Sequence, residues 1–507
     1  MLELKNISIT LLQNSRKITD NFSFTLNRGE KAAIIGEEGN GKSTLLKMIY
    51  DDRLISGYAE YSGEIIKKGS IGYLAQMIDE KYSDKTAEEY LDTDEISSYG
   101  GLFSELGLNL ELLGHQKIRT MSGGERVKLQ LAKILMSNPD ILLLDEPTND
   151  IDINTLEWLE SFINKTRLPV LFVSHDETLI EHTANVIIHM EQLIKKSQCR
   201  ITVTHASYSE YLSARSLAFS KQQQMASKQR ADYNKQMEKW QQIYNRVNHE
   251  QKSISRQDPH GGRLLKKKMK SVKSQQRRLE HKTEDFIDFP EEESAIITEF
   301  SQNIYIPRSK VVLDFYADKL SAGGRILSEN IRLCVTGDEH IGIIGSNGAG
   351  KSTLLSQLWQ AVKDRRDITA EYMPQDYSEK ADYAKTPIEY LAQNFTKDEI
   401  TKARTFMGSM RFTHEEMTNK IGDLSGGQKA KILFLEMVLK NANVLLLDEP
   451  TRNFSPLSNP VVRRSLREFR GAIISISHDR KYLSEVCDKI YRLDKNGLTA
   501  AYAQDFI

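Results

Sequence analysis

The sequence has few cysteines and prolines and no long apolar run. Its 507 residues include three cysteines and 11 prolines. Cys199, Cys334 and Cys487 lie far apart and form no CxxC spacing, so we expect neither a disulfide framework nor a zinc or iron–sulfur cluster. No stretch approaches the roughly 18 consecutive apolar residues of a membrane-spanning helix. These absences, together with a strand-like N-terminus without a leader pattern, predict a cytoplasmic protein with no membrane partner.

The sequence also has almost no net charge, −1 at pH 7, but this balance conceals an uneven distribution. Residues 211–282 contain 18 Lys and Arg against 5 Asp and Glu, an excess of 13 positive charges. The remainder of the chain therefore carries an excess of 14 negative charges. Within the basic segment, RLLKKKMKSVKSQQRR (263–278) holds eight basic residues and no carboxylate. Such a segment is typical of a surface that meets a polyanion.

Four motifs recur in the same order in the two ends of the chain. GEEGNGKSTLL (36–46) recurs as GSNGAGKSTLL (345–355), MSGGE (121–125) as LSGGQ (424–428), ILLLDEPT (141–148) as VLLLDEPT (444–451), and SHD (174–176) as SHD (477–479). From the SGG motif onward the offset stays at 303 residues. Each copy alternates buried, strand-like apolar runs with helical patterns, which predicts two α/β domains with largely parallel sheets.

The segment between the copies predicts two long helices folded back as an antiparallel pair. Apolar side chains at spacings of three and four share compatible heptad frames: Tyr233, Met237, Trp240, Tyr244 and Val247, then Leu265, Met269, Val272, Leu279 and Phe286. At 1.5 Å per residue, each arm should reach on the order of 40 to 60 Å. Trp240 and Tyr244 have the character to stack on bases, but their heptad spacing favours packing inside the helical pair.

The tip of this helical hairpin is expected near 248–265, at DPHGG (258–262). Pro259 should end a helix, and Gly261 and Gly262 should allow the reversal around His260. The predicted domains are therefore residues 1–204, a basic hairpin linker at 205–295, and residues 296–507.

Both glycine loops match GxxxxGK[ST], in which backbone N–H groups and a helix N-terminus surround phosphate oxygens and a lysine reaches the outer phosphates. Ser43 and Ser352 should hold Mg²⁺. The predicted nucleotide-binding residues of the two loops are Gly36, Gly39, Asn40, Gly41, Lys42, Ser43 and Thr44, and Gly345, Asn347, Gly348, Ala349, Gly350, Lys351, Ser352 and Thr353.

An apolar run ending in Asp-Glu places two carboxylates at the carboxyl end of a strand in each copy, where ligands collect in α/β sheets. Asp145 and Asp448 are positioned to hold the metal. Glu146 and Glu449 are positioned to polarise a water for attack on the γ-phosphate. The alternative, a carboxylate pair that merely caps a helix, does not explain the glycine loop about 100 residues upstream in both copies.

These motifs together resemble the ATP-binding cassette (ABC) proteins, with SGGE and SGGQ as signature motifs. The resemblance implies that two ATP molecules are hydrolysed at composite sites, each joining the glycine loop of one copy to the signature motif of the other. It assigns γ-phosphate contacts to Ser122, Gly123 and Gly124 in one copy and to Ser425, Gly426 and Gly427 in the other. It further implies that Gln76 and Gln375 sense metal and water, and that His175 and His478 contact the γ-phosphate.

Two copies in one chain with a basic helical pair between them resemble the ABC-F subfamily, whose members act on ribosomes. DEPTRNFSPLSNP (448–460) further resembles the branch that protects bacterial ribosomes from lincosamide, pleuromutilin or streptogramin A drugs. This resemblance implies a monomer that binds the 70S ribosome at the transfer-RNA exit region, contacting ribosomal RNA, P-site transfer RNA and large-subunit proteins, and leaves on ATP hydrolysis. The expected RNA-binding residues are Arg263, Lys266, Lys267, Lys268, Lys270, Lys273, Arg277 and Arg278.

Three other functions share parts of this pattern. A housekeeping translation factor of the same subfamily would have every motif. A transporter motor would need a membrane partner, and a DNA-repair ATPase usually has zinc cysteines or longer arms.

The sequence also departs from the family pattern. The segments ITLLQNSRKITD (9–20) and LSAGGRILSE (320–329), where the family usually has an aromatic residue that stacks on adenine, contain none. The segment after DEPT contains Asp152 as the matching loop aspartate in the first copy but no aspartate in the second. We therefore expect weak base selectivity and unequal communication between the two ATP sites.

Overall fold

The computed structural model describes residues 1–13, 15–92, 96–109, 113–193, 198–253, 259–283, 286–289, 300, 304–392 and 394–502. The chain divides into two compact units, Met1–Tyr208 together with Glu293–Ile507, and Ser209–Glu292. Both copies of the repeat therefore lie in one unit. We call residues 1–208 copy 1 and residues 304–502 copy 2. A search of the described residues finds no helix with the length and hydropathy that crossing a membrane requires.

Each copy is built on a six-stranded sheet with the same strand order, β5-β6-β7-β3-β8-β9 and β13-β14-β15-β12-β16-β17. Five strands of each sheet are parallel, and the last strand is antiparallel to its neighbour. The strands are β5 Ile71–Leu74, β6 Ile141–Asp145, β7 Val170–Val173, β3 Lys31–Ile35, β8 Val186–Leu193 and β9 Gln198–Thr204, then β13 Ala370–Met373, β14 Val444–Asp448, β15 Ala472–Ile476, β12 His340–Ile344, β16 Lys489–Asp494 and β17 Gly497–Ala501.

The central strands are buried along their whole length, which explains why they appear as unbroken apolar runs in the sequence. All five residues of β6 and of β14 are buried, as expected for parallel strands covered by helices on both faces. This arrangement confirms the predicted α/β fold. A second, antiparallel layer adds β1 Leu2–Leu11, β2 Lys17–Leu26 and β4 Ala59–Lys67 in copy 1, and β10 Val311–Ala322 and β11 Arg325–Thr336 in copy 2.

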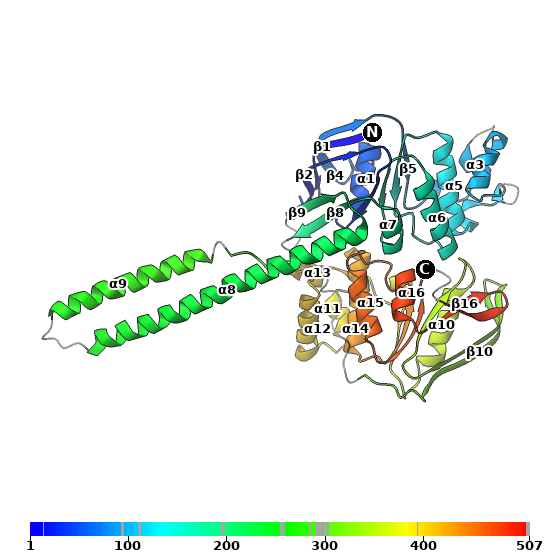
Figure 1. Ribbon diagram of the computed structural model, residues 1–507. Helices are drawn as coiled ribbons and strands as arrows, with labels where there is room; N and C mark the ends of the chain where they lie inside the picture. Colours follow the sequence, from blue (N-terminus) through cyan, green and yellow to red (C-terminus); the bar gives the residue numbers. More distant parts are fainter. Residues whose placement is uncertain are drawn as a thin grey trace. The chain divides into compact units, whose positions relative to one another are not determined.

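The helices connect and cover the strands (Figure 1). Those of copy 1 are α1 Lys42–Tyr50, α2 Ala87–Leu91, α3 Gly100–Glu105, α5 Gly123–Met136, α6 Ile153–Lys165 and α7 Glu177–Thr183. Those of copy 2 are α10 Lys351–Val362, α11 Pro387–Leu391, α12 Lys397–Ser409, α13 His414–Thr418, α14 Gly426–Leu439, α15 Asn459–Arg467 and α16 Arg480–Val486.

The second unit is the predicted helical hairpin. Helix α8, Tyr208–Ser253, has 46 residues and α9, Pro259–Lys282, has 24, so they are about 69 and 36 Å long at 1.5 Å per residue. They run side by side (Figure 1) and share an apolar seam. The seam contains predicted heptad residues of both helices, namely Tyr233, Met237, Trp240, Tyr244 and Val247 with Met269, Val272 and Leu279.

Trp240 and Tyr244 pack within this seam, as their spacing favoured. The indole Nε1 of Trp240 donates to the carbonyl oxygen of Val272 at 2.8 Å, and its ring stacks on that of Tyr244 with the centroids 5.2 Å apart. Trp240 is buried and its one polar hydrogen has a partner, so this side chain stabilises the hairpin and is not presented to a base.

The predicted turn at DPHGG is wrong in its details. Pro259 does not end a helix; it is the first residue of α9, and Gly261 and Gly262 lie inside the first turn of that helix. Proline is well tolerated at this position because its missing N–H has no intrahelical partner there. Residues 254–258, the centre of the expected tip, lie outside the described part of the chain.

Candidate nucleotide-binding sites

Each glycine loop connects a buried strand to a helix, as predicted. Loop 36–44 follows β3 and leads into α1, and loop 345–353 follows β12 and leads into α10. The loops require glycine for physical reasons: Gly36 has φ +146°, and a Cβ there would lie 2.3 Å from the carbonyl oxygen of Met190. The equivalent Gly345 has φ +156°, and a Cβ there would lie 2.6 Å from the carbonyl oxygen of Leu493.

The two loop lysines fold back onto their own loops. Lys42 Nζ donates to the carbonyl oxygens of Gly36 and Glu37 at 2.8 and 3.1 Å. Lys351 Nζ donates to those of Gly345 and Ser346 at the same distances. Burial lowers the pKa of Lys351, although the nearby carboxylates oppose this effect. Both ammonium groups are therefore held inside the cradle where an outer phosphate would lie.

The aspartates at the ends of β6 and β14 lie against the loop serines. Ser43 Oγ donates to Asp145 Oδ1 at 2.7 Å, and Tyr73 donates to Asp145 Oδ2 at 3.0 Å. In copy 2, Asp448 Oδ2 is buried and has no hydrogen-bond partner. A hydroxyl beside a carboxylate forms the oxygen-rich ligand set that suits Mg²⁺. The orphaned oxygen of Asp448 therefore fits a metal ligand.

The glutamates that follow these aspartates, which the sequence analysis assigned to catalysis, have an unusual backbone in both copies. Glu146 has φ +48° and Glu449 has φ +52°, a left-handed conformation that non-glycine residues rarely adopt. Such strain is concentrated at functional sites, where the surrounding structure enforces it. Both side chains are well buried within their sites.

The two glutamates nevertheless differ in their histidine contacts. His175 Nε2 lies 3.0 Å from Glu146 Oε1, and its Nδ1 lies 2.8 Å from the carbonyl oxygen of Phe454 in copy 2. Burial disfavours the Glu146 carboxylate, but His175 holds its pKa below the usual value. His478 Nε2 is 3.8 Å from Glu449. Glu449 therefore lacks the same support, and burial beside Asp448 raises its pKa to about 8.

The signature motifs lie at helix N-termini. Ser122 caps α5 and Ser425 caps α14, and in each case the serine oxygen accepts from the backbone N–H three residues later. The N–H groups of the following glycines therefore point out of the helix end, where anions bind. Gly123 is required by a close approach, because a Cβ there would lie 1.8 Å from the carbonyl oxygen of Asp150.

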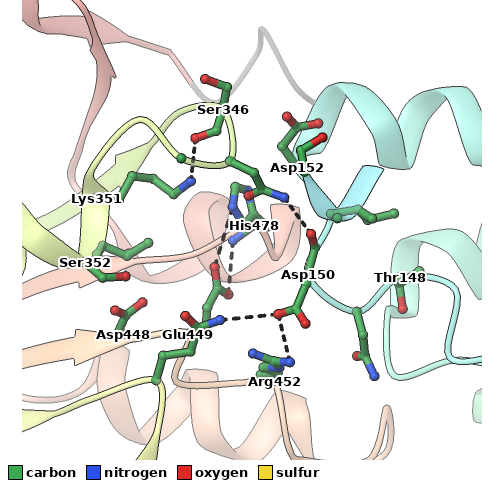
Figure 2. A pocket seen from close by; sticks show the side chains of 18 of the residues that line it. Thr148, Asp150, Asp152, Ser346, Lys351, Ser352, Asp448, Glu449, Arg452 and His478 are labelled. Atoms are coloured by element: carbon green, nitrogen blue, oxygen red, sulfur yellow. Dashed lines mark hydrogen bonds and ion pairs between the residues drawn. The ribbon is translucent and has the colours of Figure 1, made fainter. Parts of the chain in front are cut away.

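One pocket joins the signature motif of copy 1 to the glycine loop of copy 2, and we call it the second site (Figure 2). Its volume is about 960 Å³, enough for a nucleotide-sized ligand. It brings together residues that the sequence analysis assigned to one composite site: Ser122, Gly123, Gly348, Gly350, Lys351, Ser352, Thr353, Gln375, Asp448, Glu449 and His478. Asp152 of copy 1 also lines it and caps α6 by accepting from Thr155 N–H at 3.0 Å.

Asp150 lies at the centre of the contacts across the second site, and the sequence analysis did not single it out. Its carbonyl oxygen accepts from Asn347 Nδ2 at 2.5 Å. Its carboxylate pairs with Arg452 at 2.9 Å and accepts from Gln375 Nε2 at 3.5 Å. Figure 2 shows Asp150 and Asp152 of copy 1 opposite the loop of copy 2.

The first site joins the glycine loop of copy 1 to the signature motif of copy 2, and it differs at the position equivalent to Asn347. Here Glu38 accepts from the backbone N–H of Gly427 at 2.5 Å. Its carboxylate oxygens also lie 3.1 Å from where a Cβ of Gly426 would be. A carboxylate of the protein therefore occupies the N-terminus of α14, the end that the resemblance assigns to the γ-phosphate.

A position-by-position comparison of the two copies gives the signal for these missed residues. Glu38 and Asn347 stand at the same place in the two loops, and Asp150 and Asn453 stand 303 residues apart after DEPT. The first site therefore combines a loop glutamate, Glu38, with Asn453, whereas the second site combines a loop asparagine, Asn347, with Asp150. Asn453 lies beside Glu38, because its Cγ is also 3.2 Å from where a Cβ of Gly426 would be.

No aromatic side chain other than histidine lines the second-site pocket within the described residues, and its apolar wall includes Ala322 and Leu327. Both come from the β10–β11 hairpin, which precedes the glycine loop of copy 2. An aliphatic wall offers apolar contact to a base but no ring to stack on.

The remaining predicted residues are placed as follows. Gln76 is exposed just after β5, and Gln375 is exposed just after β13. All eight cations assigned to RNA binding lie on α9 with exposed side chains. In the described part of the chain none of them forms an ion pair.

Comparison with known proteins identifies the repeat. The family profile described as "ABC transporter" matches residues 19–149 and 328–452, about half of the chain. The chain belongs to this family. It is an ATPase of the F subfamily, because relatives of that subfamily match it along its length. "ABC transporter F family member 2" of Arabidopsis thaliana is 25% identical over 100% of this chain and 78% of its own length.

A further relative and a solved structure match the chain over most of its length. "Probable ATP-binding protein YheS" of Escherichia coli (strain K12) is 28% identical, covering 96% of this chain and 77% of the relative. A crystal structure of archaeal ribosomal stalk protein aP1 with the ribosome recycling factor aABCE1 matches 98% of this ABC-F chain and 90% of that chain, with a TM-score of 0.59 at 17% identity. That likeness shows the fold of the two copies.

Proposed function

We propose that this ABC-F protein uses ATP to bind the ribosome, with the basic hairpin as its contact to RNA. The observation that supports this most is the surface of α9. Eight exposed cations lie outside the apolar seam and have no internal acidic partner among the described residues. An uncompensated charge of this density on a helical pair favours a polyanion, because each phosphate contact releases condensed counterions.

The seam explains why these cations remain available to a partner. Met269, Val272 and Leu279 face α8, so the intervening lysines and arginines point to the other faces of the helix. The segment that follows α9 is also held against α8. Gln229 accepts from Ile287 N–H at 2.8 Å, and Arg230 donates to the carbonyl oxygen of Ile287 at 3.2 Å. A stiff hairpin suits folded RNA, which proteins recognise largely by shape.

Two of the similar structures support a ribosomal partner. One contains a ribosomal stalk protein bound to a recycling factor, and another is a "Model of ribosome-bound archaeal Pelota and ABCE1" with a TM-score of 0.55. We propose a ribosomal partner for this chain as well, because its hairpin carries an excess of positive charge. The predicted domain boundaries, 1–204, 205–295 and 296–507, separate the two ATP-binding copies from the hairpin that would contact RNA.

Within the cassettes, we propose that ATP closes both composite sites before hydrolysis. Lys42 and Lys351 would bind the outer phosphates, and Glu146 and Glu449 would take the proton of the attacking water. Ser43 with Asp145, and Ser352 with Asp448, would hold Mg²⁺, joined by Gln76 and Gln375. When bound, the metal neutralises phosphate charge. His175 and His478 would position the γ-phosphate.

The finer proposal is protection of the bacterial ribosome from drugs that bind near the peptidyl transferase centre. Its support is the segment 448–460, whose residues Arg452, Asn453 and Phe454 all contact or line the interface between the copies. Expression in a drug-sensitive bacterium should raise the inhibitory concentration of a lincosamide, pleuromutilin or streptogramin A. Unchanged susceptibility to all three would leave a housekeeping translation factor as the function.

The hairpin assignment is tested by replacing Lys266, Lys267, Lys270 and Lys273 with glutamine. These side chains are exposed, so the fold should be unaffected. We expect ribosome affinity to fall about tenfold or more at moderate salt, and the slope of log affinity against log salt to decrease by about three. Binding is measured by sedimentation with 70S ribosomes across a salt series.

The matched control changes Lys68, Lys363, Lys397 and Lys402, four exposed lysines of the cassettes, to glutamine. Both variants lose the same net charge, so the control should retain the wild-type salt slope. Equal loss of affinity in the two variants would show that overall charge, and not the hairpin, drives binding.

A further inference from the structure

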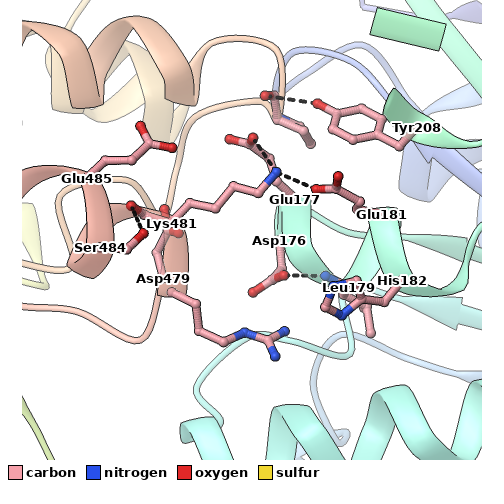
Figure 3. Close-up of polar contacts among 12 residues, drawn as sticks. Asp176, Glu177, Leu179, Glu181, His182, Tyr208, Asp479, Lys481, Ser484 and Glu485 are labelled. Carbon is pink, nitrogen blue, oxygen red and sulfur yellow. Dashed lines mark hydrogen bonds and ion pairs between the residues drawn. The ribbon is translucent and has the colours of Figure 1, made fainter. Parts of the chain in front are cut away.

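The two copies also meet through buried ion pairs whose four residues do not line the second-site pocket. Glu177 is the first residue of α7, and Arg480 is the first residue of α16. Glu160 lies on α6 and Arg463 on α15. These four side chains form the centre of what we call the pairing surface. Figure 3 shows the surroundings of Glu177 at this surface.

Two arginines of copy 2 bind two glutamates of copy 1 across this surface. Arg463 Nη1 lies 2.5 Å from Glu177 Oε1, and the two side chains are only 3% and 4% exposed. Arg480 pairs with Glu160, and those side chains are 5% and 12% exposed. Because both pairs are largely buried, removing one partner leaves the other charge in a poorly solvated place with only partial compensation, from Glu485 beside Arg463 and from Lys481 beside Glu177.

The 303-residue repeat makes these two pairs equivalent. Glu160 of copy 1 corresponds to Arg463 of copy 2, and Glu177 corresponds to Arg480. Each pair therefore joins the Glu160/Arg463 position of one copy to the Glu177/Arg480 position of the other. A symmetric interface would have the same residues in both copies, but here both positions are acidic in copy 1 and basic in copy 2.

A third equivalent position also differs between the copies. His182 of copy 1 corresponds to Glu485 of copy 2. Inside copy 1, His182 Nδ1 lies 3.2 Å from Glu160. Inside copy 2, Glu485 lies 2.9 Å from Arg463. The residue beside the acidic position is thus an imidazole in copy 1, and the residue beside the basic position is a carboxylate in copy 2, so this neighbour changes together with the residue that it contacts.

The inversion determines which domains fit together. If copy 1 met another copy 1 in the same geometry, Glu160 would face Glu177 twice. If copy 2 met another copy 2, Arg463 would face Arg480 twice. Like charges brought together in a buried interface are strongly unfavourable, and such repulsion is how interfaces reject a wrong partner.

We propose that the pairing surface is a specificity device that makes copy 1 accept copy 2 and reject a second copy 1. The occupant that it selects is copy 2 of the same chain. Lys481 adds to this preference by lying 2.6 Å from Glu181 and 3.6 Å from Glu177 (Figure 3). Tyr208, the last residue of copy 1, donates its hydroxyl to the carbonyl oxygen of Pro456 at 3.1 Å, which fixes the end of copy 1 to copy 2.

This device goes beyond ATP hydrolysis and ribosome binding, and it does not depend on the ribosome. It ensures that each glycine loop meets the signature motif of the other copy. Two identical copies would have no such protection, because each could pair with its counterpart in a neighbouring molecule. A single chain with two inverted surfaces favours the intramolecular arrangement, which needs no second molecule.

The test exchanges the three positions in the full-length chain. The first variant gives copy 1 the residues of copy 2, by Glu160→Arg, Glu177→Arg and His182→Glu. Arginine then faces arginine across the surface. The second variant adds Arg463→Glu, Arg480→Glu and Glu485→His, which restores complementary pairs with the signs exchanged. Including Glu485 is necessary because a glutamate at position 463 would otherwise lie beside it.

We expect the first variant to lose ATPase activity about tenfold or more, because the copies no longer meet correctly. Amide hydrogen exchange at the starts of α7 and α16 should become faster, while the far-ultraviolet circular dichroism stays unchanged. The second variant should regain most of the activity and protection. Lys489→Glu, which breaks a pair with Glu339 inside copy 2, is the control and should leave the interface protected.

Two results would overturn the proposal. The first is wild-type activity and protection in the variant with arginine facing arginine. The second is an exchanged variant that is as defective as the first variant. Neither measurement involves ribosomes, so a failure here and a failure of the ribosome-binding proposal are separate.

Discussion

The two composite sites share their motifs but differ in what faces the signature motif. The second site is an open pocket of about 960 Å³ between Ser122 and Lys351. In the first site, Glu38 accepts from Gly427 N–H and places a carboxylate at the end of α14. The comparison shows that repeated motifs do not make repeated sites, because one side chain in a glycine loop decides what the opposite signature motif binds.

The glutamate–histidine pairs of the two copies also differ in their separation. Glu146 is supported by His175 at 3.0 Å, whereas Glu449 is 3.8 Å from His478. Burial lowers the pKa of His478 to about 3, so this imidazole is neutral near pH 7. In the first site a carboxylate of the protein therefore meets the signature helix, whereas the second site has a pocket large enough for a nucleotide. We expect ATP to enter the second site first.

The largest expected effect comes from removing the two carboxylates that we propose to be catalytic. Glu146→Gln and Glu449→Gln should each abolish hydrolysis at one site, and the double variant should hydrolyse ATP at least about 100-fold more slowly than the wild type. Single-turnover hydrolysis of radiolabelled ATP by the two single variants measures each site separately. Equal rates from both single variants would contradict the inequality of the sites, and an active double variant would contradict their catalytic role.

A smaller effect should follow from exchanging the residues that distinguish the loops. Glu38→Asn removes the carboxylate that competes with the γ-phosphate at Gly427, so ATP should bind the first site about tenfold more tightly, a difference of about 1.4 kcal/mol. Calorimetric titration with a nonhydrolysable ATP analogue, fitted to two sites, measures this change.

The reciprocal variant provides the matched control. Asn347→Glu places a carboxylate in the equivalent loop position of the second site and should weaken ATP binding there by a similar factor. If neither variant changes either affinity, Glu38 does not compete with the phosphate and the two sites are equivalent in binding.

The smallest effect concerns the base. The second-site pocket has the aliphatic side chains of Ala322 and Leu327, and stacking on an aromatic ring would add only about 1 kcal/mol. ATP and GTP should therefore differ less than about fivefold in kcat/KM. Steady-state hydrolysis of both nucleotides checks this, and a preference of two orders of magnitude would require a base contact that these residues do not provide.

Much of the fold follows from local sequence signals. β6 and β14 are apolar runs that end in Asp-Glu, and the apolar run, its length and the repeat all indicate a buried parallel strand. The hairpin seam was equally predictable because Trp240, Val247, Val272 and Leu279 keep a heptad spacing. Each of these signals depends only on neighbours within one or two helical turns or along one strand.

The features that were predicted wrongly or missed are ones for which the local sequence allows more than one structure. Pro259 is compatible with the end of one helix and with the first turn of the next, and the structure has the second arrangement. Contacts between the copies were also beyond local patterns. Glu38 with Gly427, and Glu177 with Arg463, connect residues 389 and 286 positions apart, so their pairing depends on which surfaces face each other.

The central claim is that ATP bound in the composite sites allows the basic hairpin to bind the ribosome. The most direct measurement is sedimentation of the Glu146→Gln, Glu449→Gln variant with 70S ribosomes, with and without ATP. The claim predicts that the variant pellets with ribosomes when ATP is present and stays in the supernatant without it. A variant that remains free in the presence of ATP, or that pellets equally without nucleotide, would contradict it.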